Sequence, residues 1–112
     1  MKFWKIAGGF VLFLFVNLST AGYTANTGGK VAWLKIYNSN VIYFSLDTMP
    51  TDHQCANNYF ALDPNLTERQ SDRYYSLLLA ARTSGATVSV GYDNQNASCV
   101  YGGTPVIYAV SM

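Results

Sequence analysis

Apolar and polar residues alternate with a period of two in two neighbouring segments, residues 31–37 and 41–46, which are rich in β-branched and aromatic side chains. This pattern predicts two strands, because successive side chains of a strand point to opposite faces. The turn-forming residues 38–40 separate them, so we expect a hairpin. In the first strand, one face would carry Ala32, Leu34 and Ile36 toward the core, and the other would carry Trp33, Lys35 and Tyr37.

A helical pattern follows a long loop. Apolar residues recur at spacings of three and four at Tyr74, Leu77, Leu78 and Ala81. Thr67 and Gln70 fit a capping box at the start of the helix, with Ser71 as an alternative cap, and Gly85 supplies the stop. The preceding residues 47–66 are rich in turn formers, and only residues 59–62 read as a short strand.

The period returns to two after Gly85. Three further strands are expected at residues 87–92, 97–101 and 105–111, with turns at 93–96 and 102–103. This order does not suit alternating βαβ units, so a parallel sheet is not expected. The fold class is mainly β with one helix. We expect a small OB-like antiparallel barrel over residues 31–112, the alternative being an open α+β antiparallel sheet with the helix on one face.

The N-terminus has the pattern of a signal peptide. Lys2 and Lys5 precede an uncharged apolar run from Ile6 to Leu18, which is too short for a stable membrane anchor. Small residues before a cleavage point after Ala21 complete the pattern, with a cut after Ala25 as a weaker second choice. Residues 1–21 are therefore expected to be a signal peptide, residues 22–30 a flexible N-terminal segment, and the mature protein secreted or periplasmic.

Charge excludes one large class of partners. The chain of 112 residues has seven basic and six acidic residues, and loss of Lys2 and Lys5 leaves five basic residues against six acidic ones, a formal charge of −1. A near-neutral chain without a basic run lacks the electrostatic footprint of a nucleic-acid-binding protein. No nucleic-acid partner is expected.

The two cysteines, Cys55 and Cys99, lie in the part of the chain that would be exported. An even cysteine count in an oxidising compartment predicts a disulfide. The alternative is a reactive thiol assisted by His53, two residues before Cys55. The even count favours the disulfide, because a nucleophilic thiol needs an unpaired cysteine.

Candidates for catalysis and metal binding are few. The chain has a single histidine, and its carboxylates stand mostly alone in predicted turns or helix starts. No catalytic residue, metal site or cofactor is expected. Asn65 and Asn96 match the glycosylation sequon, which matters only in a eukaryotic source.

Aromatic and amide residues offer a binding chemistry instead. Aromatic rings stack on the apolar faces of sugars, and amides satisfy sugar hydroxyls, so this combination is typical of glycan binding. The alternative explanation is that tyrosine is simply a good strand residue. The candidate ligand-binding residues on the predicted strands and turns are Trp33, Tyr37, Asn38, Asn40, Tyr92 and Asn94.

One stretch resembles a known family. Residues 74–92 run from an apolar helix through Thr83, Ser84 and Gly85 into an alternating strand, and Cys99 follows. The first hairpin matches more loosely. This pattern resembles the B subunits of subtilase cytotoxin and related pentameric toxins of the AB type. The resemblance implies an OB-type barrel with one helix, assembly into rings and binding of host glycans.

Departures from that family limit what is carried over. Gly28, Gly29 and Lys30 stand where the family has a sugar-contacting serine, and Ser45 stands where a cysteine is expected. No residue is therefore assigned a binding role through the resemblance.

Two functions are consistent with these observations. The first is a secreted, non-enzymatic toxin B-subunit-like domain that binds host or cell-surface glycans, forms a homo-oligomer such as a pentamer, and has an A subunit as a partner. The alternative is a periplasmic or extracellular protein-interaction module, an inhibitor or assembly factor, that does not bind sugar.

Overall fold

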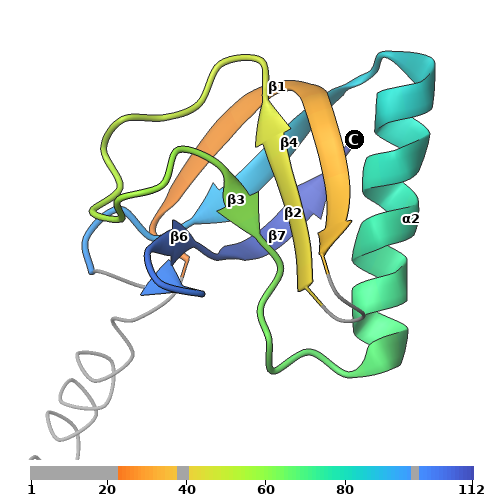
Figure 1. The fold of residues 1–112 in the computed structure, drawn as a ribbon. Coiled ribbons are helices and arrows are strands. Elements are labelled where there is room, and N and C mark those ends of the chain that lie inside the picture. Colours follow the sequence, from red (N-terminus) through yellow and green to blue (C-terminus); the bar gives the residue numbers. More distant parts are fainter. Residues whose placement is uncertain (1–22, 38–40, 97–98) are drawn as a thin grey trace, which may run out of the picture.

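The computed structural model describes residues 23–37, 41–96 and 99–112. The predicted signal peptide and the candidate residues Asn38 and Asn40 lie outside these ranges. Over these residues the fold is mainly β with one helix, as predicted (Figure 1). Its elements in chain order are β1 (Ala25–Tyr37), β2 (Val41–Leu46), β3 (Phe60–Ala61), α2 (Glu68–Ser84), β4 (Thr87–Tyr92), β5 (Cys99–Val100), β6 (Thr104–Pro105) and β7 (Ile107–Ser111).

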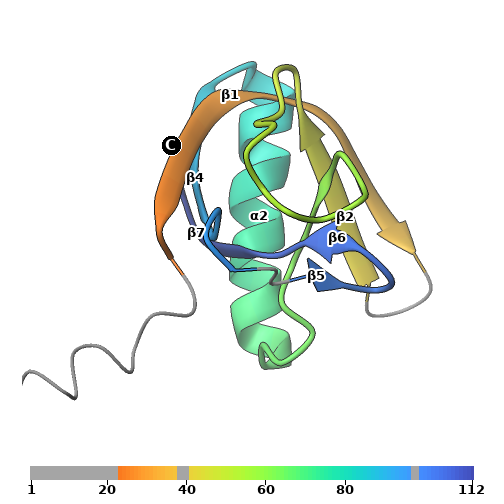
Figure 2. The ribbon, with the colours of Figure 1, turned by 90° about the vertical axis from the view of Figure 1, so that its left-hand side faces the viewer.

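Strand β1 joins the two halves of an antiparallel five-stranded sheet, ordered β3-β2-β1-β4-β7. Its first half pairs with β4, from Ala25 opposite Tyr92 to Lys30 opposite Thr87. Its second half pairs with β2. The strand therefore bends strongly between its two partners, and the sheet curves with it (Figure 2).

The prediction of a flexible segment over residues 22–30 is wrong from Ala25 onward. These residues form the start of β1, because β4 supplies the partner for their backbone groups. Gly29 suits this place: a Cβ added there would lie 2.6 Å from an Asp47 carboxylate oxygen. The same oxygen accepts a hydrogen bond from the Lys30 backbone N–H at 3.1 Å.

The predicted core face of the first strand needs two corrections, at Ala32 and Ile36. The pairing register with β2 shifts between Val31 and Trp33, so Ala32 sits in an irregularity and is exposed rather than directed to the core. Leu34 packs against the core as predicted, whereas Ile36 remains 52% exposed. Trp33, Lys35 and Tyr37 share the outer face.

The core lies between the concave side of the sheet and the helix. Its fully buried side chains include Phe44, Phe60, Leu78, Val88 and Val90. Helix α2 contributes Leu78 and Ala81 as its buried residues and lies along the curved sheet (Figure 2). Within the described part of the chain, no helix has the length and apolarity needed to cross a membrane.

Both predicted ends of the helix are confirmed. Thr67 and Gln70 form the capping box, with the Gln70 backbone N–H donating to Thr67 Oγ1 at 3.1 Å and the Thr67 N–H donating to Gln70 Oε1 at 3.0 Å. Gly85 ends the helix in the left-handed region at φ 74°, where glycine lacks the Cβ clash of other residues.

The sheet is not closed into a barrel, so the open α+β alternative fits the structure. Among the described residues, one isolated parallel bridge, Ala61 to Val106, joins the β3 edge to the segment that enters β7. The sheet closes no further, because β3 is only two residues long. In addition, β6, the strand before β7, pairs with β5 in a separate sheet. The strand predicted at 105–111 is thus divided between β6 and β7.

Candidate aromatic binding surface

The outer face of the β1–β2 pair is aromatic. Trp33 and Tyr37 lie on this face of β1 with Lys35 between them, and Tyr43 stands directly opposite Lys35 on β2. Residues directly opposite in an antiparallel pair share a face of the sheet. The hairpin alone therefore places three aromatic side chains and one cation on one side.

Five rings form a connected group on this face, which we call the aromatic surface: Trp33, Tyr37, Tyr43, Tyr59 and Tyr101. Tyr43 is central, with ring centroids 5.1 Å from Tyr59, 5.8 Å from Tyr101 and 6.1 Å from Tyr37. Trp33 joins through Tyr59, at 5.5 Å. These separations lie within the range of favourable tilted and edge-to-face aromatic contacts.

The aromatic surface combines exposed and supporting rings. Trp33 is 37% exposed, Tyr37 56% and Tyr101 38%, whereas Tyr43 and Tyr59 are half-buried. Holding several large rings together at the surface leaves apolar area in water, and such contiguous patches mark interaction sites. The arrangement offers three ring surfaces on a support fixed by two strands.

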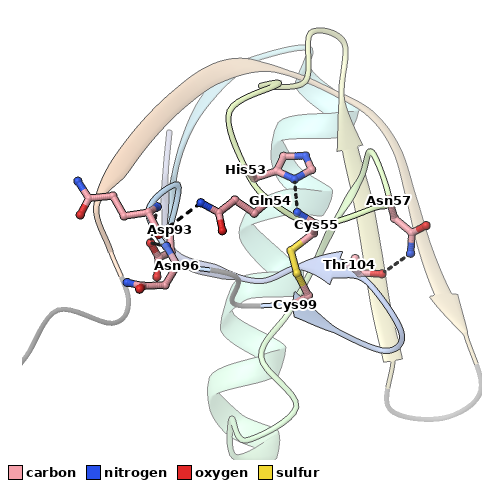
Figure 3. The surroundings of a disulfide bond; sticks show 9 residues. His53, Gln54, Cys55, Asn57, Asp93, Asn96, Cys99 and Thr104 are labelled. Atoms are coloured by element: carbon pink, nitrogen blue, oxygen red, sulfur yellow. Dashed lines mark hydrogen bonds between the residues drawn. A yellow bond between two sulfur atoms is a disulfide. The ribbon is translucent and has the colours of Figure 1, made fainter.

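Tyr59 and Tyr101 reach this surface from segments that are distant in the sequence. Tyr59 lies just before β3, and Tyr101 lies in the turn between β5 and β6. The predicted disulfide between Cys55 and Cys99 joins these two segments (Figure 3). It acts with Asn57, whose backbone N–H donates to the Gly103 carbonyl at 2.8 Å and whose side chain donates to Thr104 Oγ1 at 3.0 Å.

The disulfide also removes the thiol alternative. Neither cysteine is free, and His53 Nδ1 accepts the Cys55 backbone N–H at 3.2 Å (Figure 3). His53 therefore helps to shape the disulfide loop. Among the described residues, no group of three or more histidine, cysteine, aspartate or glutamate side chains could hold a metal ion.

Tyr101 occupies an unusual backbone conformation. Its φ of 51° is positive, and Gly102 and Gly103 follow at 79° and 127°. A bulky aromatic residue is uncommon in this region, because its Cβ crowds the backbone. Glycine would adopt the conformation more readily, yet tyrosine stands here and its ring packs edge-on against Tyr43. Strain of this kind is concentrated at functional sites.

The aromatic surface is largely uncharged. Burial raises the pKa of the Tyr43 hydroxyl, and burial together with the Asp63 carboxylate raises the pKa of the Tyr101 hydroxyl. Both phenols therefore stay protonated at neutral pH and can donate as well as accept hydrogen bonds. The cation of this face is Lys35, whose Nζ lies 5.7 Å from the Trp33 ring centroid.

Two predicted ligand-binding residues belong elsewhere. Tyr92 is 3% exposed and its ring packs against Phe60, so the expectation that it stacks on a ligand is wrong. Its hydroxyl donates to Asp52 Oδ1 at 2.5 Å, and the Asn94 side chain donates to Asp52 Oδ2 at 2.9 Å. These bonds hold the β2–β3 loop against the end of β4.

Three members of the aromatic surface were absent from the predicted site. Tyr43 could have been found from the hairpin register, since it stands opposite Lys35. Tyr59 and Tyr101 carried no such local signal, because the disulfide and the turn after β5 bring them to Tyr43. Asn65 and Asn96, the sequon residues, are both exposed.

Comparison with known proteins adds no family assignment. No protein-family model matches the chain, and neither the curated proteins nor the solved structures include a significant match.

Proposed function

We propose that the protein is an exported, non-enzymatic glycan-binding domain and that the aromatic surface is its binding site. The observation that carries this proposal is the connected group of five rings, three of them exposed, on the outer face of a paired sheet. An aromatic ring stacks on the apolar face of a pyranose, and protonated tyrosine hydroxyls exchange hydrogen bonds with sugar hydroxyls.

The support beneath the rings suits this role. Trp33, Tyr37 and Tyr43 stand on hydrogen-bonded strands, while the disulfide and Asn57 fix the turn that carries Tyr101. Ordering these side chains before binding lowers the entropy lost when a ligand docks. The rings of this preorganised surface are uncharged, and Lys35 beside them is a single cation. Such a surface favours an uncharged or weakly charged ligand over a nucleic acid.

As the finer description of this open sheet we propose a partly open OB-type arrangement. The strongly bent strand β1 is shared by the two halves of the sheet, and the helix lies between β3 and β4 in sequence. One parallel bridge joins the β3 edge to the segment that enters β7. With it we propose the toxin B-subunit-like role, in a homo-oligomeric ring with an A subunit as partner. Light scattering on the mature protein tests the ring: a pentamer supports it, and a monomer overturns that part.

A glycan array followed by titration calorimetry of the best-binding glycan tests the binding function. We expect Trp33→Ala and Tyr37→Ala each to lower the affinity for that glycan at least tenfold. The matched control is Ile36→Ala, a 52% exposed residue on the opposite face of the same strand. It should leave affinity within twofold. Absence of any bound glycan, or equal loss in the control, would overturn the assignment.

The second candidate function uses the same surface for a protein partner. Exposed aromatic clusters also receive proline-rich segments, whose extended helix packs between rings. A negative glycan array, together with a captured secreted protein that dissociates on Trp33→Ala but not on Ile36→Ala, would select this alternative. An inhibitor or an assembly factor would fit that result.

A further inference from the structure

The exposed rings of the aromatic surface are separated from one another. Within the described residues, Trp33 contacts Tyr59, and both Tyr37 and Tyr101 contact Tyr43, so every ring contact of an exposed ring is with a half-buried one. The exposed rings are therefore spread around a supporting pair. A ligand that covers one of them does not thereby cover the others.

The spacing along β1 sets a scale. Trp33 and Tyr37 lie four residues apart on one face of this strand. With a rise of about 3.3 Å per residue, their Cα atoms are about 13 Å apart, and the bend of β1 can only shorten this. That length exceeds a single pyranose and corresponds to several linked units. Lys35 lies between them on the same face, where its ammonium can donate to ligand hydroxyls.

The rings also lie outside two grooves of the described surface. One groove runs between α2 and β7 and is lined by Arg73, Tyr74, Leu77, Tyr108, Ala109 and Val110. The other lies between the start of α2 and the β1–β2 pair, with Ile36 and Ile42 among its lining residues. Neither is lined by a ring of the aromatic surface. A terminal sugar is held best by a pocket that encloses it, whereas an open row of rings suits the side of a longer chain.

We propose that the ligand of this surface is a linear glycan bound along its length, with its axis following β1 from Trp33 to Tyr37, and that internal units rather than a terminal sugar make the contacts. This inference rests on the proposed glycan-binding function. Each ring adds a modest stacking contribution, and units linked in one chain engage the second ring as an intramolecular event. Affinity should therefore rise with chain length.

The test is an affinity ladder on the full mature protein. The probes are β-1,4-linked glucose and N-acetylglucosamine oligomers of one to six units, together with matched ladders of any backbone that the glycan array selects. We expect hexamer affinity to exceed dimer affinity at least tenfold in the ladder that binds. The double variant Trp33→Ala, Tyr37→Ala should lower the hexamer affinity to that of the dimer. Ile36→Ala should leave the difference between hexamer and dimer affinity unchanged.

The outcomes separate the two proposals. A glycan that binds through these rings with equal affinity as monomer, dimer and hexamer would overturn linear-chain binding and leave the glycan-binding function standing. If no glycan binds, both the glycan-binding function and linear-chain binding are overturned. If the alanine variants lose their fold by circular dichroism, Trp33→Leu and Tyr37→Leu keep apolar bulk on the strand while removing the ring, and they give the same readout.

Discussion

The hydroxyl group of Tyr92 donates a hydrogen bond to the carboxylate of Asp52 across 2.5 Å, and this contact ties the β2–β3 loop to the last residue of β4. That loop continues to Cys55 and Tyr59, so the contact secures one end of the segment that builds the aromatic surface. The hydrogen bond from Tyr92, with that from Asn94, lowers the pKa of Asp52 below its ordinary value.

Removing the Tyr92 hydroxyl should make the free energy of unfolding less dependent on pH in the acidic range. Asp52 has a lowered pKa in the folded state, so its contribution is present above the unfolded value of about 3.9 and is lost as the pH falls through the folded value. Tyr92→Phe should cost about 1 kcal/mol at pH 7, and the difference from wild type should shrink below about pH 4. Urea unfolding at both pH values measures this.

The control for that substitution is Tyr75→Phe. Tyr75 packs against the core, and no hydrogen bond of its hydroxyl is found among the described residues. It should change the free energy of unfolding by less than Tyr92→Phe at pH 7, and its effect should be the same at both pH values. A pH-independent loss in Tyr92→Phe would contradict the role of Asp52.

Tyr92 should ionise well above the ordinary range of a tyrosine. Burial, with the bond to Asp52, raises its pKa from the ordinary value of 10.0 to about 12. The raised value favours the neutral phenol in the folded state, so its contribution is complete below about pH 10 and is lost as the pH rises toward about 12. A spectrophotometric titration of phenolate should show a late step that Tyr92→Phe removes. An unchanged late step would assign it to another tyrosine.

Replacing both cysteines with serine should weaken the fold and the binding site together. The disulfide joins residues separated by 44 positions, for which the loop-entropy model gives about 4 kcal/mol of stabilisation. Urea unfolding should show a loss of this order. Glycan affinity of the remaining folded fraction should also fall, because Tyr101 follows Cys99 by two residues. Full affinity in a folded double variant would mean that the disulfide does not position this ring.

Tyr101→Asn should separate stability from binding. Asparagine tolerates a positive φ better than tyrosine, which offsets the lost contact with Tyr43. We expect the free energy of unfolding to change by less than about 1 kcal/mol. Glycan affinity should fall at least threefold in calorimetry. A large loss of stability with no loss of affinity would make Tyr101 a structural residue.

Gly85→Ala should destabilise the helix end by about 1 kcal/mol. The φ of 74° disfavours any Cβ, although nothing lies within 4 Å of the place that it would occupy. Gly28→Ala is the matched control. Its φ lies outside the left-handed region, and its nearest contact would be an ordinary 3.5 Å from the Val88 carbonyl oxygen. Thermal unfolding of both variants should show a lower midpoint for Gly85→Ala, and equal midpoints would refute the cap.

The sequence by itself determined the features whose causes are local. The capping box at Thr67, the glycine stop at Gly85 and the antiparallel pairing of β1 with β2 follow from interactions between residues close in sequence, and they were predicted correctly. The Cys55–Cys99 disulfide was also predictable, because two cysteines allow one intramolecular pairing.

Only the tertiary structure decided the rest. Ala25 to Lys30 form a strand because β4 pairs with them, and Ala32 turns outward because the register shifts beside it. Tyr92 is buried because β4 presents it to Phe60, whereas Tyr59 and Tyr101 reach the surface because a disulfide brings their segments to Tyr43. Each outcome depends on a partner far away in the sequence, and local periodicity carries no information about which distant residues will meet.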